Sequence, residues 1–380
     1  MYDLLREELI KTSDVIVIKV GTNVLSRKDG HLNIERIERL AEDISRIFSR
    51  GRKLILVSSG AVGAGMGRLN LHKRPILVPQ LQAVAAIGQS KLIEAYEAAL
   101  GRFNCHAAQV LLTADDLSIR RRYLNARNAL RAMLDFGAIP IVNENDTVSV
   151  HELHTTFGDN DRLASLVAGL FDNPLLILLT DVNGLYDRNP AEPDAQLISI
   201  VDHWTEELMS FVVEKNSQRS RGGMASKLAA AKIVTESGGN MLIANGDDPE
   251  ILRKIFNADD VGTLFLVQDQ LLNAKKRWIG FAGRTSGSIY VDAGAAEAVA
   301  KKRTSLLSVG ILNCDGSFEK GDLISMVDPQ GREFARGLCN YRMTDVMAIR
   351  GKKSDEIQTV LGRCPYEEVV HRDNIQVKIV

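Results

Sequence analysis

The regular alternation of short apolar runs with amphipathic segments constrains the fold of this chain more than any other feature of its sequence. Runs rich in Val, Ile and Leu have the length of buried strands. The segments between them place apolar residues at the three- and four-residue spacing of a helix. In residues 33–50, for example, this stripe is complete, and Gly51 ends it. The alternation predicts an α/β fold with a mainly parallel sheet that helices cover on both faces.

The predicted elements follow one another without an internal repeat. We expect strands at residues 14–20, 53–57, 107–112, 138–142, 175–179, 240–244 and 263–267. We expect helices at residues 33–50, 79–100, 121–136 and 224–237, and two more that begin near residues 161 and 249. Ligands of open α/β sheets bind outside the carboxyl ends of the strands, so the residues that follow each strand are the candidates for a site.

The pattern changes near residue 268. The sequence up to residue 268 is predicted to form one domain, residues 269–284 a linker, and residues 285–380 a small β-rich domain. Short strands are expected there at residues 288–291, 310–312, 323–327 and 334–338, with one helix at residues 293–302. Glycine-containing turns separate the strands, as at Asp315-Gly316 and Lys320-Gly321. A chain of 380 residues fits two domains better than one core.

Composition excludes several classes of protein. An apolar content of 45% with 25% charged residues excludes disordered and collagen-like chains. The net charge of −1 argues against a general attraction to nucleic acid or anionic membrane. From Lys275 onward there are 17 basic and 13 acidic residues, a net of +4, against 30 and 35 before it, a net of −5.

The four cysteines, the N-terminus and the apolar runs bear on location. The cysteines are far apart in the sequence, and their spacing matches no metal-binding motif. This indicates reduced thiols rather than a disulfide framework. No signal peptide is recognisable, and no run approaches 18 apolar residues. We therefore expect a cytoplasmic protein without contact to a membrane.

Lys19 and Gly21 end the first predicted strand. A lysine beside the free amides of a tight turn can stabilise phosphate oxygens. A solvated lysine at a strand end is the alternative, and Gly21 weighs against it because glycine allows backbone to approach a ligand.

Two glycine-rich segments suggest further anion sites. Residues 58–67 follow a strand and contain neither a dinucleotide fingerprint nor a Walker A motif, so they are expected to form a glycine-rich loop before a helix. Residues 222–227 resemble Walker A without its glycine before the lysine, and are expected to form a glycine turn that opens a helix. A cation at Lys227 would oppose the helix dipole and calls for a compensating anion, such as a phosphate. A tight turn and a solvated lysine are the respective alternatives.

Polar clusters follow two other segments. Asn143-Glu144-Asn145-Asp146 could hold an amino group, a hydroxyl group or a metal, or form an Asx turn. Gly158-Asp159-Asn160-Asp161 could contribute to a site or cap a helix. His151-Glu152-Leu153-His154 lacks the spacing of the zinc protease motif.

Taken together, these motifs resemble the glutamate 5-kinase family, whose members have an amino-acid-kinase fold and, in the long form, a C-terminal PUA domain. The resemblance spans almost the whole chain. It rests on residues 18–22, 58–61, 123–127, 142–146, 158–161, 180–181, 184–186, 223–224 and 227, and on residues 305–307, 310–311 and 316–318 of the small domain. It implies a three-layer αβα catalytic domain and a PUA-like pseudo-barrel.

The resemblance also implies roles for individual residues. The nucleotide, ATP with Mg²⁺, would be bound by Lys19, Gly21, Thr180, Asp181, Arg221, Gly222, Gly223, Met224, Ala225, Ser226 and Lys227. L-Glutamate would be bound by Ser59, Gly60, Asn143, Asp146 and Asn160, with Asp146 at the ammonium group. We expect Lys19 and Lys227 to flank the transferred phosphoryl group and Asp159 to hold the two lysines in place; the ligands of the metal stay open.

The family usually has a Thr-Gly-Gly-Met loop with Ser-Thr before the lysine. This chain has Arg221 and Ala225 at two of those positions, so a threonine hydroxyl contact is lost at residue 221. The resemblance further implies feedback inhibition by proline, a glutamyl phosphate reductase as pathway partner, and a homo-oligomer, either a dimer or a tetramer.

Two alternatives remain. Another amino-acid kinase, acting on aspartate or N-acetylglutamate, would share the fold. RNA binding through the C-terminal domain would rest on the basic residues at 275–277 and 301–303, whereas the acidic front part of the chain argues against it.

Overall fold

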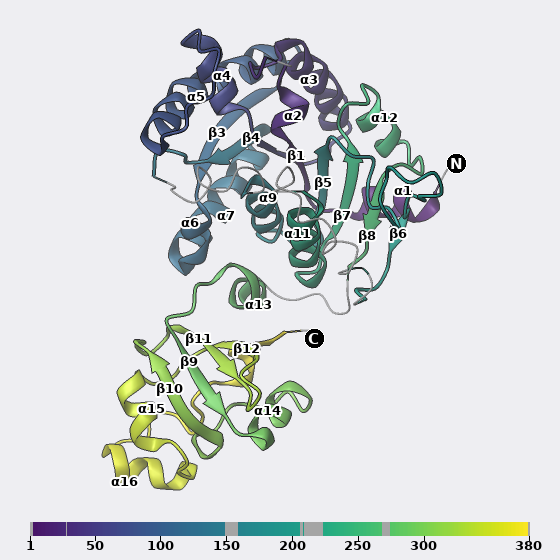
Figure 1. Cartoon of the computed structure of the whole chain (residues 1–380). Coiled ribbons are helices and arrows are strands. Elements are labelled where there is room, and N and C mark those ends of the chain that lie inside the picture. Colours follow the sequence, from purple (N-terminus) through teal and green to yellow (C-terminus); the bar gives the residue numbers. More distant parts are fainter. Residues whose placement is uncertain are drawn as a thin grey trace. The chain divides into compact units, whose positions relative to one another are not determined.

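The computed structural model describes residues 3–27, 29–148, 159–205, 208, 223–267 and 274–378, and for residues 159 and 274 only the backbone. The chain divides into two compact units (Figure 1). One comprises residues 1–116 and 123–271, and the other comprises residues 117–122 and 272–380. The finer borders expected at residues 268 and 285 stay predictions.

The first unit is built on an eight-stranded sheet with the strand order β3-β4-β2-β1-β5-β7-β8-β6. Its strands are β1 (Ile16–Val20), β2 (Leu54–Ser58), β3 (His106–Leu112), β4 (Ala138–Glu144), β5 (Leu175–Thr180), β6 (Ile200–Val201), β7 (Asn240–Asn245) and β8 (Thr263–Phe265). Among the strand pairs described within this sheet, only β7 and β8 are antiparallel. The predicted mainly parallel α/β sheet is confirmed.

Helices surround this sheet (Figure 1). They are α1 (Leu4–Thr12), α2 (Thr22–Leu25), α3 (Ile34–Ser49), α4 (Ala61–Arg68), α5 (Val78–Gly101), α6 (Ala114–Ser118), α7 (Arg120–Asp135), α9 (Asp159–Ala168), α11 (Met224–Glu236) and α12 (Ile251–Phe256). The predicted cap of α3 is present, since the side chain of Asn33 accepts a hydrogen bond from the Arg36 amide.

Alternation along β1 gives the sheet two different faces. Ile16, Ile18 and Val20 belong to one apolar cluster with residues of α3 and α5. Successive side chains of a strand point to opposite faces, so Val17 and Lys19 face the other side. Helix α9 packs against β1 there.

The glycine-rich segment at residues 58–67 does not form the loop that its glycines predict. Apart from its first three residues it forms α4, with Gly63, Gly65 and Gly67 inside the helix. The reason is the close packing of α4 on α5. A Cβ atom at Gly65 would lie 1.9 Å from the carbonyl oxygen of Val84, and one at Gly88 would lie 1.8 Å from that of Ala61. Gly65 of α4 and Gly88 of α5 therefore serve the packing of the two helices.

The second unit holds a five-stranded mixed sheet in the order β10-β9-β11-β12-β13. Its elements are α13 (Ala274–Arg277), β9 (Gly287–Val291), α14 (Ala293–Ala300), β10 (Ile311–Gly316), β11 (Leu323–Val327), β12 (Glu333–Leu338), α15 (Met343–Ile349), α16 (Ile357–Leu361) and β13 (Ile375–Val377). Apolar side chains of these strands and of α15 form its own core. The predicted β-rich domain is confirmed, whereas α15, α16 and β13 were not expected.

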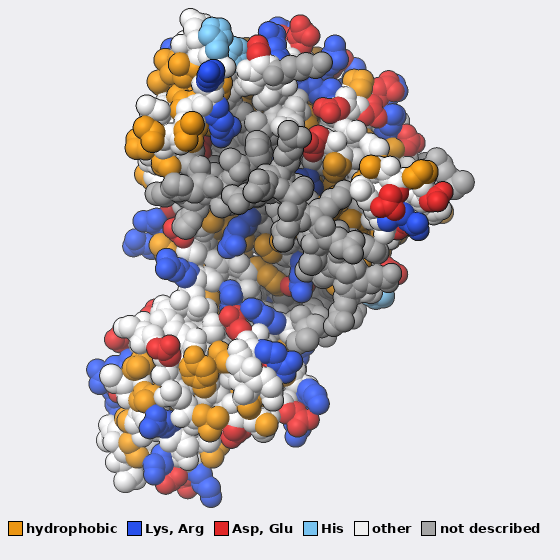
Figure 2. All heavy atoms as spheres, viewed as in Figure 1, with side chains coloured by type: hydrophobic (Ala, Val, Ile, Leu, Met, Phe, Trp, Pro, Cys, Tyr) orange, Lys and Arg blue, Asp and Glu red, His pale blue; other side chains and the backbone are white. Residues whose placement is uncertain are grey.

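Other expectations about the molecule can be compared with the structure. All four cysteines are free thiols, as predicted. Within the described residues, no helix is both long and apolar enough to cross a bilayer. On the visible face of the second unit, acidic and basic side chains are interspersed (Figure 2).

Candidate active site

Lys19 is a buried cation at the carboxyl end of the central strand. Its side chain lies on the α9 side of the sheet, where its Nζ atom is 2.6 Å from Oδ1 of Asp161. Only 8% of the residue is exposed. Burial of an ammonium group is costly unless a charge of opposite sign accompanies it, and Asp161 provides that charge.

Lys227 reaches the same carboxylate from α11. Its Nζ atom lies 3.8 Å from Oδ2 of Asp161, and Ser226 donates a hydrogen bond of 3.0 Å to that oxygen. Lys227 stands in the first turn of its helix, where the dipole disfavours a cation. The anion expected beside Lys227 is therefore, within this chain, Asp161. Asp161 itself lies in the first turn of α9, where negative charge is favourable.

The contacts of this cluster shift the ionisation of Asp161 and of Lys227. Burial acts to raise the pKa of Asp161, but the attraction of Lys19 and Lys227 and the hydrogen bonds from Lys19 and Ser226 outweigh it and leave that pKa below its ordinary value. Burial lowers the pKa of Lys227, and repulsion from Lys19 adds to this, while Asp161 partly opposes it. With both lysines protonated, the cluster carries one net positive charge in a buried position, which suits an anionic group.

A second carboxylate lies at the end of the neighbouring strand. Asp181 follows β5 and accepts hydrogen bonds from Asn23 (2.9 Å) and from Thr180 (3.0 Å). Burial acts to raise the pKa of Asp181, but these hydrogen bonds outweigh it and lower the pKa. On the adjacent end of β1, the Gly21 amide donates to the Leu179 carbonyl at 3.1 Å. The predicted nucleotide-binding residues of β1 and β5 thus lie side by side.

Buried amides connect the predicted substrate-binding residues. Nδ2 of Asn160 donates to Oγ of Ser59 at 2.8 Å and to Oδ1 of Asn143 at 3.2 Å. Nδ2 of Asn143 donates in turn to Oε1 of Gln89 in α5 at 2.8 Å. All four residues are buried. We call Gln89, Asn143, Asn160 and Ser59 the amide network.

The amide network crosses the edge of the sheet. Gln89 comes from α5, Asn143 from the end of β4, and Asn160 from the start of α9. Ser59 follows β2, and its neighbour Gly60 has a φ of +109°, a left-handed conformation that favours glycine at the start of α4. Asp146 lies half-buried in the turn after β4.

Comparison with known proteins adds independent evidence. Residues 14–245 match the model of the amino acid kinase family, and residues 287–361 match the PUA domain. A protein of Rhodopirellula baltica named glutamate 5-kinase is 48% identical over 99% of this chain and 97% of its own length. One of Thermoanaerobacter sp. with the same name is 44% identical over 95% of this chain and 97% of its own length. A third protein named glutamate 5-kinase, from Methanococcoides burtonii, is 42% identical over 97% of this chain and 98% of its own length.

The chain belongs to the glutamate 5-kinase family. The family and the long form with a PUA domain are those that the sequence motifs indicated. The shared length covers both units, so the second unit is part of the family pattern and not an addition peculiar to this chain.

Not every predicted residue of this family member can be placed. Arg221 and Gly222 lie outside the described residues, as do His151 and His154, and so does the side chain of Asp159. The position between the two lysines is occupied by Asp161, for which the sequence pattern predicts no individual role. The prediction for Asp159 stays a prediction, but the two ion pairs seen here are not its own.

Two further residues of the site were not predicted. Asn23 gives no signal in the sequence, because its partner Asp181 lies far along the chain. Gln89 stands in the middle of a helix, where a glutamine is ordinary. Only the fold shows that it faces Asn143.

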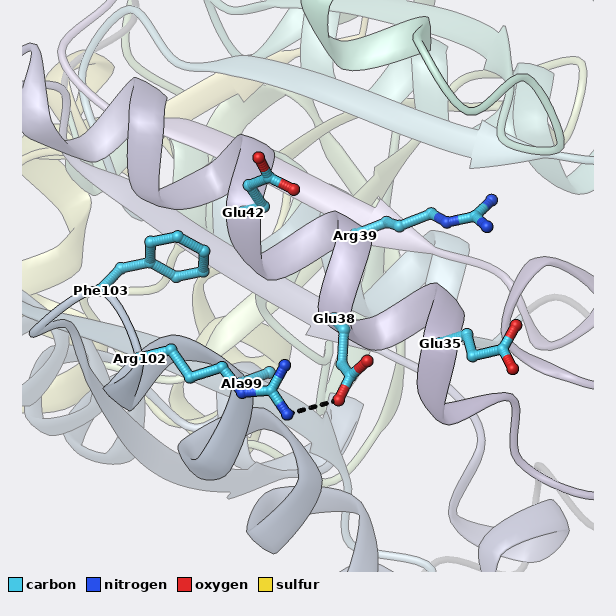
Figure 3. A pocket seen from close by; sticks show the side chains of 7 residues that line it. All are labelled: Glu35, Glu38, Arg39, Glu42, Ala99, Arg102 and Phe103. Atoms are coloured by element: carbon cyan, nitrogen blue, oxygen red, sulfur yellow. Dashed lines mark hydrogen bonds and ion pairs between the residues drawn. The ribbon is translucent and has the colours of Figure 1, made fainter.

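A hollow of about 330 Å³ elsewhere in the first unit lies between α3 and the end of α5 (Figure 3). Glutamate and arginine side chains dominate its lining, and Glu38 and Arg102 form an ion pair of 2.7 Å there. None of the predicted site residues lines it. The candidate site is therefore the edge of the sheet, not this hollow.

Proposed function

We propose that this protein transfers the γ-phosphoryl group of ATP to the γ-carboxylate of L-glutamate, the first step toward proline. The observation that carries the proposal is the pair of buried lysines that contact Asp161. The first turn of α9, which holds Asp161, also holds Asn160 of the amide network. Asp161 and Asn160 are consecutive residues, so the phosphoryl-handling and substrate-binding groups share one helix start.

The reaction needs positioning and charge neutralisation rather than a base. A carboxylate of glutamate is already deprotonated at neutral pH. One of its oxygens attacks the γ-phosphorus while the bond from phosphorus to the bridging oxygen of ADP breaks, and no proton moves. Charge on the migrating phosphoryl group is stabilised by Lys19 and Lys227, which Asp161 holds in place.

Thr180, Asp181 and the start of α11 support nucleotide binding, and Gly21 leaves the end of β1 open to phosphate. We propose that Mg²⁺ arrives on the phosphates of ATP, because this ion keeps most of its water ligands. Ser59, Asn143 and Asn160 would hold glutamate, with Asp146 at its ammonium group. Arg221 and Gly222 are proposed to complete the nucleotide loop.

Several finer points belong to the same proposal. Proline carries a carboxylate and an ammonium group as glutamate does, so it would compete at the amide network as a feedback inhibitor. An acyl phosphate is labile, which calls for a reductase that consumes it. We further propose a cytoplasmic homo-oligomer, either a dimer or a tetramer. RNA binding by the second unit has no support from the interspersed charges on the face seen in Figure 2.

The test is formation of a hydroxamate from L-glutamate, ATP and hydroxylamine, which traps the acyl phosphate. Lys19→Ala should lower the rate by about 10²–10³, the usual effect of removing one preorganised charge. Lys53→Ala is the matched control, since that lysine pairs with Asp135 at the surface. Equal rates for the Lys19 variant and the wild type would refute the proposal. L-Aspartate and N-acetyl-L-glutamate, the substrates of the alternative kinases, should give no hydroxamate.

A further inference from the structure

We infer that Gln89 is a positioning residue that fixes the orientation of the amide network and so makes the site select a substrate with an α-ammonium group. The inference rests on the proposed function and adds a residue to which no role has been given. Gln89 acts through Asn143 and Asn160 rather than by touching the reacting atoms.

The hydrogen bonds of the network have one direction. Oε1 of Gln89 accepts from Nδ2 of Asn143, which leaves Oδ1 of Asn143 to accept from Nδ2 of Asn160. The same nitrogen of Asn160 donates to Ser59. Each amide has one donating and one accepting end, so the orientation of one member determines the orientation of the next.

This direction decides what Asn160 presents. Its Nδ2 is committed to Asn143 and Ser59, and its Oδ1 is buried without a hydrogen-bond partner among the described residues. A buried acceptor of this kind matches an ammonium group. Ser59 accepts from Asn160, so its own hydroxyl hydrogen remains able to meet a carboxylate oxygen. The opposite orientation would engage Oδ1 of Asn160 with Asn143 and turn a donor toward the ligand.

Gln89 is the member that can hold the observed direction. It is 8% exposed, and its Nε2 is a buried donor with no described partner. Rotating the Gln89 amide would place this donor against the donor of Asn143, which is unfavourable. The backbone at Gln89 cannot move away from Asn143, because the neighbouring residue Gly88 packs directly on α4. A Cβ atom at Gly88 would lie 2.3 Å from the Gly65 amide nitrogen.

Two substitutions separate the accepting function from the mere presence of a side chain. Gln89→Met keeps the length and removes the acceptor. Gln89→Glu keeps an oxygen that accepts from Asn143, whether the carboxyl is ionised or protonated. Tyr123→Phe is the matched control, because it removes another buried hydrogen bond, from Tyr123 to the Gly169 carbonyl, away from the network.

The experiment measures KM for L-glutamate and the inhibition constant of glutarate, which has both carboxylates but no ammonium group. Gln89→Met should raise KM for L-glutamate about 10-fold, as expected when a buried hydrogen bond to a charged group is lost. The inhibition constant of glutarate and KM for ATP should change less than about threefold. Gln89→Glu and Tyr123→Phe should both keep the preference for L-glutamate over glutarate.

The inference would be overturned if Gln89→Met weakened the binding of L-glutamate and of glutarate equally. It would also be overturned if the variant bound both molecules as the wild type does. If Gln89→Met does not fold, Gln89→Ala, which leaves space for water, takes its place in the same measurement. Absence of hydroxamate from wild-type protein with L-glutamate would instead refute the proposed function. The two failures are therefore distinguishable.

Discussion

The ammonium group of Lys19 and the carboxylate of Asp161 lie 2.6 Å apart in the interior of the first unit. One comes from the central strand and the other from the first turn of α9. Their contact brings the carboxyl end of β1 to the helix start that also carries Asn160. The position and charge of Lys227 depend on the same carboxylate.

Asp161→Asn should therefore lower kcat by about 10²–10³ while the protein remains folded, because two lysines lose the charge that aligns them. The pKa of Lys227 is already lowered by burial, and loss of the Asp161 charge lowers it further. The alkaline limb of the profile of kcat against pH should move to lower pH in the variant. Asp135→Asn, at a surface ion pair with Lys53, is the control and should leave both rate and profile unchanged.

Asp161 should also contribute to stability in a pH-dependent way. Its pKa in the folded protein lies below 3.8, so the contribution is present above that pH and is lost as the pH falls through the folded-state pKa. At neutral pH, Asp161→Asn should lower the free energy of unfolding by about 3 kcal/mol, since it breaks a buried pair. Denaturant unfolding at neutral and acidic pH measures this difference. If the variant and the wild type differed in free energy of unfolding by the same amount at both pH values, the prediction would be contradicted.

Gly88→Ala should destabilise the protein by about 3 kcal/mol or more. The added methyl group would meet backbone atoms of Ala61 and Gly65, which cannot move aside as a flexible side chain can. Gly101→Ala in the same helix is the matched control, because nothing lies within 4 Å of a Cβ atom there. Thermal unfolding should show a lower Tm for the first variant and little change, or a slight rise, for the second. Similar Tm values for both variants would mean that close packing of α4 and α5 is unimportant.

Asp181→Asn should raise KM for ATP about 10-fold with little change in KM for L-glutamate. Asp181 follows β5 and accepts hydrogen bonds from Thr180 and Asn23, neither of which belongs to the amide network. Loss of a charge-assisted hydrogen bond has about this effect. Asp187→Asn, at a half-buried carboxylate six residues further along, tests for a general charge effect. A rise in KM for L-glutamate instead would move Asp181 into the substrate site.

Some of this architecture could be predicted from the sequence. Buried strands are recognisable in the sequence as apolar runs. The polar residues at the carboxyl ends of β1, β2 and β4 can therefore be located once these runs are identified. Lys19, Ser59 and Asn143 can therefore be singled out as candidates from the sequence alone. The α4 segment was mistaken for a loop because its glycines are unfavourable in an isolated helix. The advantage of Gly65 appears only when α5 approaches, and local sequence contains no sign of that contact.

The partners of the predicted residues were harder to foresee. Asp161 stood in a motif already singled out, but a run of two aspartates and an asparagine does not show which side chain turns inward. The start of α9 decides this, by facing Asp161 to the lysines and Asn160 to Ser59. Gln89 meets Asn143 only after the chain has formed two further strands and the helices between them.

The amide network has a consequence for how the protein responds to its surroundings. Serine, asparagine and glutamine side chains neither gain nor lose a proton across the range in which proteins stay folded. Recognition by these four groups is therefore insensitive to acidity, whereas the charges of Lys227 and Asp161 depend on pH. A change in pH that alters the charge of Lys227 would therefore affect how fast the bound molecule reacts more than how well these four side chains recognise it.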